Sequence, residues 1–289
     1  MRMGIVVSDP EDWTARAIHR GLHDQGLEVV ALNFSDLAAR IGPGLAFGKG
    51  EVLISDLDGL VVRDMGRGAA QDVAFRFETL HALKEMGKTV VNPPQAILRA
   101  ANKFATSVAL QRAGIPTPRT TVTSSLEEAA RAVREYGRAV SKPLFGYKGK
   151  DLHLLSEGED AALAELIRRN GLVYLQEFVP LEQPRDIRAF VVEDRVAGAI
   201  YRVAPPGSWI SNLARGGGAR PCPLTRELED LAVRANRAVG SLYSGVDLLE
   251  TPEGLKVIEV NGTPSGKGIF TAHGIDVGAM IAGRVKALL

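Results

Sequence analysis

Oxygen-bearing side chains gather near the carboxyl end of the chain, in two apolar segments that read as strands. Glu259 and Asn261 lie in "VIEVNGTPS", and a strand places residues two apart on one face. Asp247 lies in the preceding segment "SGVDLLE", and the turn-forming "TPEG" between them favours a hairpin that brings Asp247 beside the other two. Two carboxylates and an amide form an oxygen-only ligand set that suits magnesium. The alternative is polar residues at the edge of an ordinary strand pair, but a carboxylate inside an apolar strand is costly unless it is paired or metal-bound.

Lysines and glycines in the middle of the chain form a candidate phosphate-binding loop. Lys142 ends the strand-like segment "AVSKP", and Gly146 and Gly149 follow in "LFGYKGKD". The Gly-Lys-Ser/Thr pattern of a Walker loop is absent, but the amides and lysines of a hairpin loop could still cover phosphates. Lys103, shortly after the break "NPP", could reach the same phosphates. The alternatives are an ordinary basic turn and a surface lysine.

The apolar segment "LVYLQEFVP" ends in a stretch that could hold an adenine. Its last residues would expose backbone groups beside an apolar wall; they are Gln176, Glu177, Phe178 and Val179. Asp186 and Arg188 follow on one face of the next strand, "RDIRAFVV". The alternative interpretation is a linker followed by a surface ion pair.

Arginines lie among glycines in "YRVAPPGSWISNLARGGGARP". Arg202, Asn212, Arg215 and Arg220 belong to this segment. Guanidinium groups near flexible glycines suit the recognition of carboxylates or phosphates. A solvated surface loop is the alternative.

Alternating strands and helices must position these groups. Strand-like segments at 3–8, 27–32, 58–66 and 88–92 alternate with helical patterns at 12–26 and 69–87, and Ser35 can cap a further helix in "SDLAAR". This order predicts a parallel sheet covered on both faces. The first strand is not followed by Gly-x-Gly-x-x-Gly, so we expect no dinucleotide site there. Beyond "NPP", strands become more frequent, and we expect an α/β protein with an α+β arrangement in its carboxyl-terminal two-thirds.

Composition narrows the class of protein. The 289 residues carry a net charge of +1, which argues against a nucleic-acid partner. A single cysteine, Cys222, excludes an internal disulfide and a thiolate zinc site. His19 and His23 have the spacing of a helical zinc pair, but no third ligand is evident. The chain shows neither a signal peptide nor a membrane span, so a cytoplasmic protein is expected.

The order of these features resembles the ATP-grasp superfamily, and within it the ribosomal-protein glutamate ligase-like branch. The resemblance covers nearly the whole chain and is carried by "NPP", "NK", "KP", "QEF", "DIRAFVV", "SNLARGG", "GVDLLE" and "EVNGTPS". Closer similarity, to ligases that add glutamate to tetrahydromethanopterin, is carried by "RAANKFATSV", "KPLFG", "DIRAFVV" and "GVDLLETPEGLKVIEVNGTPS". The resemblance implies an ATP-grasp fold with an amino-terminal parallel-sheet pre-ATP-grasp domain. The implied division is 1–93 (Rossmann-like), 94–180 (central subdomain with the glycine loop) and 181–289 (carboxyl-terminal subdomain with the metal site).

The function that the resemblance implies is that of an ATP-dependent carboxylate-amine ligase working through an acyl phosphate. Its substrates would be small molecules, L-glutamate and a carboxylate acceptor of the tetrahydromethanopterin type, and the implied cofactors are ATP and two Mg²⁺ ions, with Mn²⁺ as a substitute. A homo-oligomer is compatible with this function, and neither a nucleic acid nor a membrane is expected as partner. The alternatives are the same chemistry on a peptide C-terminus or an amino-acid carrier protein, and a non-catalytic nucleotide-binding regulatory module.

Roles for individual residues follow from the same resemblance. The phosphates of ATP would meet Lys103, Lys142, Gly146 and Gly149. The adenine and ribose would meet Gln176, Glu177, Phe178, Val179 and Asp186. The transferring phosphoryl group and the acceptor would meet Arg188, Arg202, Asn212 and Arg215. One magnesium would bind Asp247 and Glu259, and the second Glu259 and Asn261.

Two positions depart from the family pattern. Asp151 stands where the phosphate loop usually has a third glycine, and Ile210 stands where the ribosomal-protein ligases have an arginine. The acceptor specificity of those ligases therefore does not transfer directly to this sequence.

Overall fold

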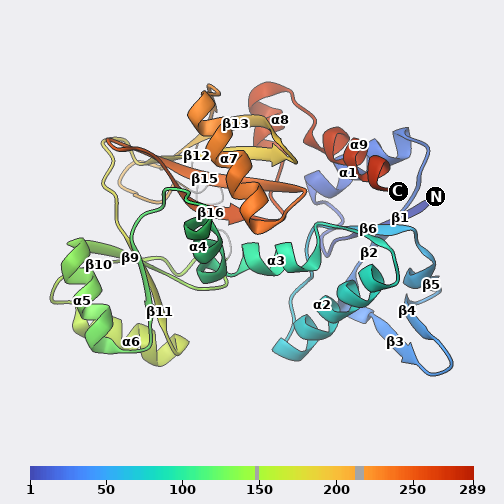
Figure 1. Cartoon of the computed structure of the whole chain (residues 1–289), viewed down its shortest axis with the longest axis horizontal. Coiled ribbons are helices and arrows are strands. Elements are labelled where there is room, and N and C mark those ends of the chain that lie inside the picture. Colours follow the sequence, from blue (N-terminus) through green and yellow to red (C-terminus); the bar gives the residue numbers. More distant parts are fainter. Residues whose placement is uncertain (147–149, 212–217) are drawn as a thin grey trace. The chain divides into compact units, whose positions relative to one another are not determined.

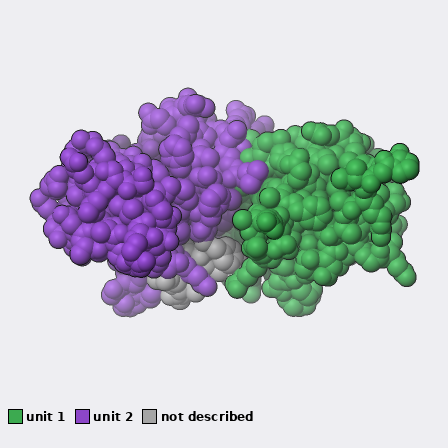
Figure 2. All heavy atoms as spheres, turned by 90° about the horizontal axis from the view of Figure 1, so that it is seen from below, with its two compact units in different colours: residues 1–97, 240–244, 262–289 green, residues 98–239, 245–261 purple. Residues whose placement is uncertain are grey.

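The computed structural model describes residues 1–146, 150–211 and 218–289, which form two compact units. The first unit comprises Met1–Ile97, Gly240–Ser244 and Gly262–Leu289, and the second comprises Leu98–Val239 and Gly245–Asn261. Figure 1 traces the elements and Figure 2 colours the two units. The division into three domains stays a prediction. Among the described residues, no helix combines the length and the apolar character needed to cross a membrane.

The first unit is built on a parallel four-stranded sheet with the strand order β2-β1-β6-β7. Its strands are β1 (Arg2–Val6), β2 (Glu28–Leu32), β6 (Gly59–Val62) and β7 (Thr89–Val91). Its helices include α1 (Trp13–Asp24), α2 (Ala70–Glu85), α8 (Lys267–His273) and α9 (Val277–Leu288), and α3 (Pro94–Ala101) begins in it. The predicted parallel sheet is therefore confirmed.

Helices α1 and α9 pack closely because small residues meet between them. A Cβ atom on Gly278 would lie 2.5 Å from Cβ of Ala17, so no side chain fits there. The start of α1 is set locally, since the carboxylate of Asp12 accepts a hydrogen bond from the backbone of Ala15 at 2.6 Å.

The helix predicted from Ser35 is wrong. Asn33 accepts a hydrogen bond from the backbone of Ser35, but only a 3₁₀ turn, η1 (Phe34–Asp36), follows. The chain then forms a small antiparallel sheet of β3 (Ala38–Ile41), β4 (Leu45–Lys49) and β5 (Val52–Leu53), with a second 3₁₀ turn η2 (Ile54–Asp56). The "GPG" after β3 explains the error, because it reverses the chain and lets β3 pair with β4.

Asn92 joins distant parts of the first unit. Its side chain is fully buried, and its amide nitrogen donates to the carbonyls of Tyr243 (2.8 Å) and Gly262 (2.7 Å). Its amide oxygen accepts from the backbone nitrogens of Leu242 (2.7 Å) and Tyr243 (3.2 Å). One side chain therefore ties the segments before and after the hairpin of β15 (Tyr243–Thr251) and β16 (Gly254–Asn261) to the end of β7.

The second unit contains two sheets. The first is antiparallel with the order β10-β9-β11-β8, and its strands are β8 (Thr120–Thr123), β9 (Arg138–Lys142), β10 (His153–Ser156) and β11 (Val173–Glu177). Helices α5 (Leu126–Tyr136) and α6 (Asp160–Asn170) pack on it through a core that includes Val133, Leu163 and Leu175.

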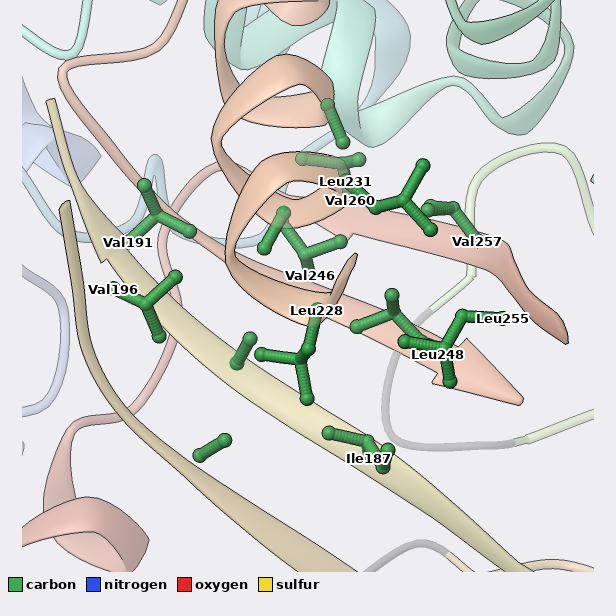
Figure 3. Packing of buried hydrophobic residues seen from close by; sticks show 14 of the residues in the cluster. Ile187, Val191, Val196, Leu228, Leu231, Val246, Leu248, Leu255, Val257 and Val260 are labelled. Carbon is green, nitrogen blue, oxygen red and sulfur yellow. The ribbon is translucent and has the colours of Figure 1, made fainter. Parts of the chain in front are cut away.

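The second sheet has the order β14-β13-β12-β15-β16. Its remaining strands are β12 (Arg185–Val192), β13 (Arg195–Val203) and β14 (Gly218–Cys222), and helices α4 (Lys103–Arg112) and α7 (Arg226–Val239) pack against it. Figure 3 shows Leu228 and Leu231 of α7 over the buried valines and leucines of the sheet. This apolar packing uses one face of the sheet. The mixture of a parallel sheet with antiparallel sheets is the α/β and α+β arrangement predicted from the sequence.

We predict that Asn92→Ala lowers the free energy of unfolding by about 3–5 kcal/mol, because it leaves several buried backbone groups without a partner. Urea denaturation measures the loss. Asn33→Ala is the matched control, since that side chain accepts one hydrogen bond on the surface and its loss should cost about 1 kcal/mol or less. Equal effects of the two substitutions would contradict the structural role of Asn92.

Candidate functional site

Asp247 and Glu259 lie directly opposite each other in the hairpin of β15 and β16. Asn261 lies opposite Gly245, two positions along, so the three oxygen-bearing side chains occupy one side of the hairpin. The pairing predicted from the sequence is thus confirmed.

A β-bulge allows this hairpin to serve the site and the core at once. The register shifts after Asp247, so that Leu248 pairs with Val257 instead of Ile258. Val257 and Val260 are both fully buried in the core, although they are three residues apart. A regular strand would turn Val257 to the same face as Glu259, and the extra residue removes this conflict.

Asp247 is held by two arginines. Its side chain is only 3% exposed; it receives Nε and Nη2 of Arg188, the latter at 2.8 Å, and Nη2 of Arg202 at 2.7 Å. Burial disfavours the charged carboxylate, but the two guanidinium groups hold the pKa of Asp247 below its ordinary value. Asp247 therefore stays ionised inside the sheet.

Asp186 completes this group of charges. Its two carboxylate oxygens accept Nε and Nη2 of Arg202 at 2.6 and 2.7 Å, and Ser211 donates its hydroxyl to the same carboxylate at 2.6 Å. Burial disfavours the charge of Arg202, yet Asp247 and Asp186 raise the pKa of Arg202 above its ordinary value. We call Asp186, Arg188, Arg202, Asp247 and Ser211 the carboxylate network. Its two cations balance its two anions.

Two lysines approach the hairpin from other elements. Asn102 caps α4 by accepting from the backbone of Ala105, and Lys103, the first residue of that helix, donates Nζ to Oε1 of Glu259 at 3.0 Å. Lys142, at the end of β9, donates Nζ to Oε1 of Gln176 at 2.7 Å. Burial lowers the pKa of Lys142 to about 8, against the opposing effect of Glu259.

The described part of the glycine loop lies against Lys103. The backbone nitrogen of Lys103 donates to the carbonyl of Leu144 at 3.0 Å, and Asn102 forms a bridge with Phe145. A Cβ atom on Gly146 would lie 2.9 Å from Cγ of Pro143 and 3.3 Å from Nζ of Lys103. Glycine thus keeps the space beside the Lys103 ammonium group open.

The predicted adenine segment is fixed by contacts that the sequence did not reveal. Glu177 forms a two-pronged ion pair with Arg119, at 2.8 and 3.1 Å, which lowers the pKa of Glu177. The ring of Phe178 lies under the guanidinium of Arg138 at 4.5 Å and edge-on to Trp209 at 5.9 Å. Val179 is half-buried. Within this segment the side chain of Gln176 bonds to Lys142, the residue predicted to meet phosphates.

The structure therefore brings most of the predicted residues together in the second unit. The carboxylate network, Glu259 and the two lysines meet around the hairpin of β15 and β16. Gly149, Asn212 and Arg215 lie outside the described residues.

The donor chemistry fits magnesium, because adjacent strands present two carboxylates and an amide. Among the described residues, no group of three or more His, Cys, Asp or Glu side chains could hold a metal ion, and the candidate set contains only two carboxylates beside its amide. Asp247 and Glu259 are instead paired with arginines and a lysine, the residues that recognise phosphate oxygens in proteins. Carboxylates of the kind that bind metals thus lie beside cations of the kind that bind phosphates.

Sequence reasoning missed Arg119, Trp209 and Ser211. Ser211 stands beside Asn212 in the motif "SNLARGG", but its partner Asp186 is 25 residues away, and no local pattern indicates that pairing. Arg119 and Glu177 are 58 residues apart and meet only because β8 and β11 are neighbours.

A cavity of about 350 Å³ lies at the ends of β12 and β13, lined in part by Arg185, Tyr201 and Arg220. Arg185 alternates with Asp186 along β12, so the two side chains point to opposite faces of the sheet. The charge of Arg185 is already balanced by Glu250 at 2.7 Å, and its guanidinium stacks on Tyr201 at 4.2 Å. The cavity is therefore distinct from the carboxylate network.

Comparison with known proteins finds relatives along nearly the whole chain. The RimK-like ATP-grasp domain matches residues 100–285. The tetrahydromethanopterin:alpha-L-glutamate ligase of Methanosarcina acetivorans is 43% identical over 95% of this chain and 95% of its own, and the ligase of that name from Methanococcus maripaludis is 35% identical over 96% and 95%. The structure of the ATP-grasp ligase PsnB with a phosphomimetic variant of its minimal precursor, Mg and ADP is similar in fold, with a TM-score of 0.75 at 21% identity, over 99% of this chain and 98% of PsnB. The chain belongs to the RimK-like ATP-grasp family.

Proposed function

We propose that this protein is an ATP-dependent carboxylate-amine ligase that joins L-glutamate to an acceptor of the tetrahydromethanopterin type. The observation that carries the proposal is the 43% identity to a ligase of that name, which extends over 95% of both chains. The residues around the β15–β16 hairpin provide the charges that such a reaction requires. We expect the reaction to take place in the cytoplasm.

The residues that would hold the nucleotide lie on three elements. Lys103 and Lys142 would meet its phosphates together with the glycine loop, and the segment 176–179 would meet its adenine. Asp247, Glu259 and Asn261 would hold two Mg²⁺ ions, for which Mn²⁺ would substitute. When bound, ATP activates the acceptor carboxylate as an acyl phosphate, and the metal neutralises phosphate charge.

The protein's own charges support this assignment. Lys103 is paired with Glu259, and Arg202 with Asp247. The cations that phosphate requires are thus partners of the carboxylates that the metal requires. Binding both ligands would exchange the partners of Lys103 and Glu259, while Arg202 would keep its bonds to Asp186 and Asp247. No buried charge would then be left unpaired, which would otherwise be strongly unfavourable.

Arg188 and Arg202 would also direct the acceptor, and Asn212 and Arg215 would join them. A planar guanidinium matches the geometry of a carboxylate and keeps its charge over the whole working pH range. The amine of glutamate would attack the carbonyl carbon of the acyl phosphate, and the arginines would compensate the negative charge that develops on the carbonyl oxygen. The C–N bond would form as the C–O bond to phosphate breaks, with release of inorganic phosphate and of the amine proton.

The test is incubation of the protein with ATP, Mg²⁺, glutamate and a tetrahydromethanopterin-type acceptor. We expect ADP release that requires both glutamate and the acceptor, and a product heavier than the acceptor by one glutamyl residue in mass spectrometry. If glutamate is added to a peptide C-terminus or a carrier protein and not to the pterin, the proposed acceptor is wrong and the ligase chemistry stands. ADP release that responds to no acceptor and no amine would favour a regulatory nucleotide-binding module.

Glu259→Gln should lower ligase turnover by about a hundredfold or more, since it removes a charge that faces the phosphates and the metal. The variant should remain folded, with a lower unfolding midpoint in urea, because Lys103 loses its charged partner. Glu253→Gln is the matched control in the turn of the same hairpin, where the side chain is 76% exposed and pairs only with Lys256 among the described residues. A Glu259→Gln protein with normal turnover would refute the metal assignment.

Nucleotide affinity should fall as the pH rises through about 8, because Lys142 loses its proton there and a neutral amine attracts phosphate less. Calorimetric titration with ADP and Mg²⁺ between pH 6.5 and 9.5 would measure the dependence. Lys142→Arg should retain its affinity at the alkaline end, since a guanidinium stays protonated. The same alkaline loss in both proteins would show that another group titrates.

A further inference from the structure

Residues 209–211, which follow β13, contact the site at two points. Ser211 donates its hydroxyl to Oδ2 of Asp186 at 2.6 Å, and the ring of Trp209 packs edge-on against Phe178 at 5.9 Å. Ser211 is 9% exposed, so water competes little for this hydrogen bond. We call residues 209–211 the anchor segment.

Ser211 is the third donor to a single carboxylate. Arg202 already approaches Asp186 with two nitrogens, Nε on Oδ1 and Nη2 on Oδ2. These two bonds align the planes of the guanidinium and the carboxylate. The Ser211 hydroxyl shares Oδ2 with Nη2, so it fixes the oxygen that this nitrogen reaches.

The same nitrogen of Arg202 also reaches the proposed metal ligand. Nη2 lies 2.7 Å from Oδ2 of Asp186 and 2.7 Å from Oδ2 of Asp247. A rotation of the Asp186 carboxylate would carry the guanidinium with it and change its contact with Asp247. The side chains of Asp186, Arg202 and Asp247 are between 3% and 8% exposed, so solvent offers little replacement for a lost bond.

We propose that Ser211 is a positioning residue for Arg202. Its hydroxyl holds Asp186 in the orientation that keeps Arg202 in line with Asp247, and it acts through Asp186. The hydroxyl is neutral, so its removal changes the alignment of the charges and leaves their sum unchanged. The consequence for catalysis rests on the proposed ligase function of Arg202 and Asp247.

Ser211→Ala should lower kcat for glutamate ligation about tenfold, which corresponds to the loss of one hydrogen bond to a charged group. The KM for ATP should change less than about twofold, because in the described part of the chain Lys103, Lys142 and Gln176 contact none of the residues of the anchor segment by a hydrogen bond or ion pair. Ser211→Thr keeps the hydroxyl and should restore at least half of the turnover. Ser208→Ala is the matched control, since that hydroxyl bonds only to Ile210 among the described residues.

A double-mutant cycle with Asp186→Asn tests the route of the effect. If Ser211 acts through Asp186, Ser211→Ala should reduce kcat by less than about twofold in the Asp186→Asn background. An undiminished tenfold loss in that background would overturn the proposal, and so would normal kcat in Ser211→Ala alone. If Ser211→Ala does not fold, Ser211→Cys provides the second variant without the oxygen donor.

A fluorescence readout separates this proposal from the proposed function. In a Trp13→Phe background, Trp209 is the single tryptophan, and acrylamide quenching reports the anchor segment. Ser211→Ala and Asp186→Asn should each raise the quenching constant, and the double variant should raise it no further. If the two substitutions raise the quenching constant additively, the Ser211–Asp186 link is overturned, whether or not ligase activity is found. If their effects on the quenching constant are not additive but the unmodified protein has no ligase activity, only the proposed function is overturned.

Discussion

The carboxylate of Asp247, buried on the penultimate strand of a five-stranded sheet, is the constraint on which the site depends. An ionised group at 3% exposure is tolerated only when nearby charges replace the water that it has lost. Arg188 and Arg202 meet that requirement, and Arg202 is in turn balanced by Asp186. Ser211 then donates to the same Asp186 carboxylate as Arg202. The need to stabilise one anion therefore organises residues from four different segments.

The sheet can carry this charge because only one of its faces is needed for the core. Val246, Leu248, Val257 and Val260 pack under α7, as Figure 3 shows, while the charged residues occupy the other face. The bulge after Asp247 lets the hairpin supply both the core and the site, since it shifts the alternation of side chains between the two faces of β16 by one residue. Packing energy and site geometry thus come from the same two strands, and the burial that stabilises the unit also holds the carboxylates in place.

The two lysines near the hairpin differ in how well their charges are balanced. Lys103 compensates Glu259, and Lys142 is bonded to the neutral amide of Gln176, which leaves its own charge less well balanced. Burial accordingly lowers the pKa of Lys142 to about 8. A polyphosphate would supply the missing negative charge, so the binding of nucleotide would stabilise the protonated lysine. This imbalance is what an enzyme awaiting an anionic ligand is expected to contain.

The sequence by itself determined the parallel sheet of the first unit, the hairpin of Asp247 and Glu259, and the order of motifs by which the family was recognised, because periodicity, turns and motif spacing are local properties of the chain. It misled at Ser35, where strand pairing prevailed over a helix cap. Only the tertiary structure decided which groups neutralise the buried carboxylates, since Ser211 and Asp186 are 25 residues apart and Lys103 and Glu259 are 156 apart. Likewise, Asn92 donates to the carbonyl of Gly262, which is 170 residues away in the sequence. The segments that flank the β15–β16 hairpin thereby belong to the first unit. Such pairs form because packed elements bring residues together that are far apart in the sequence, and no pattern within a single segment predicts which partner each residue will have.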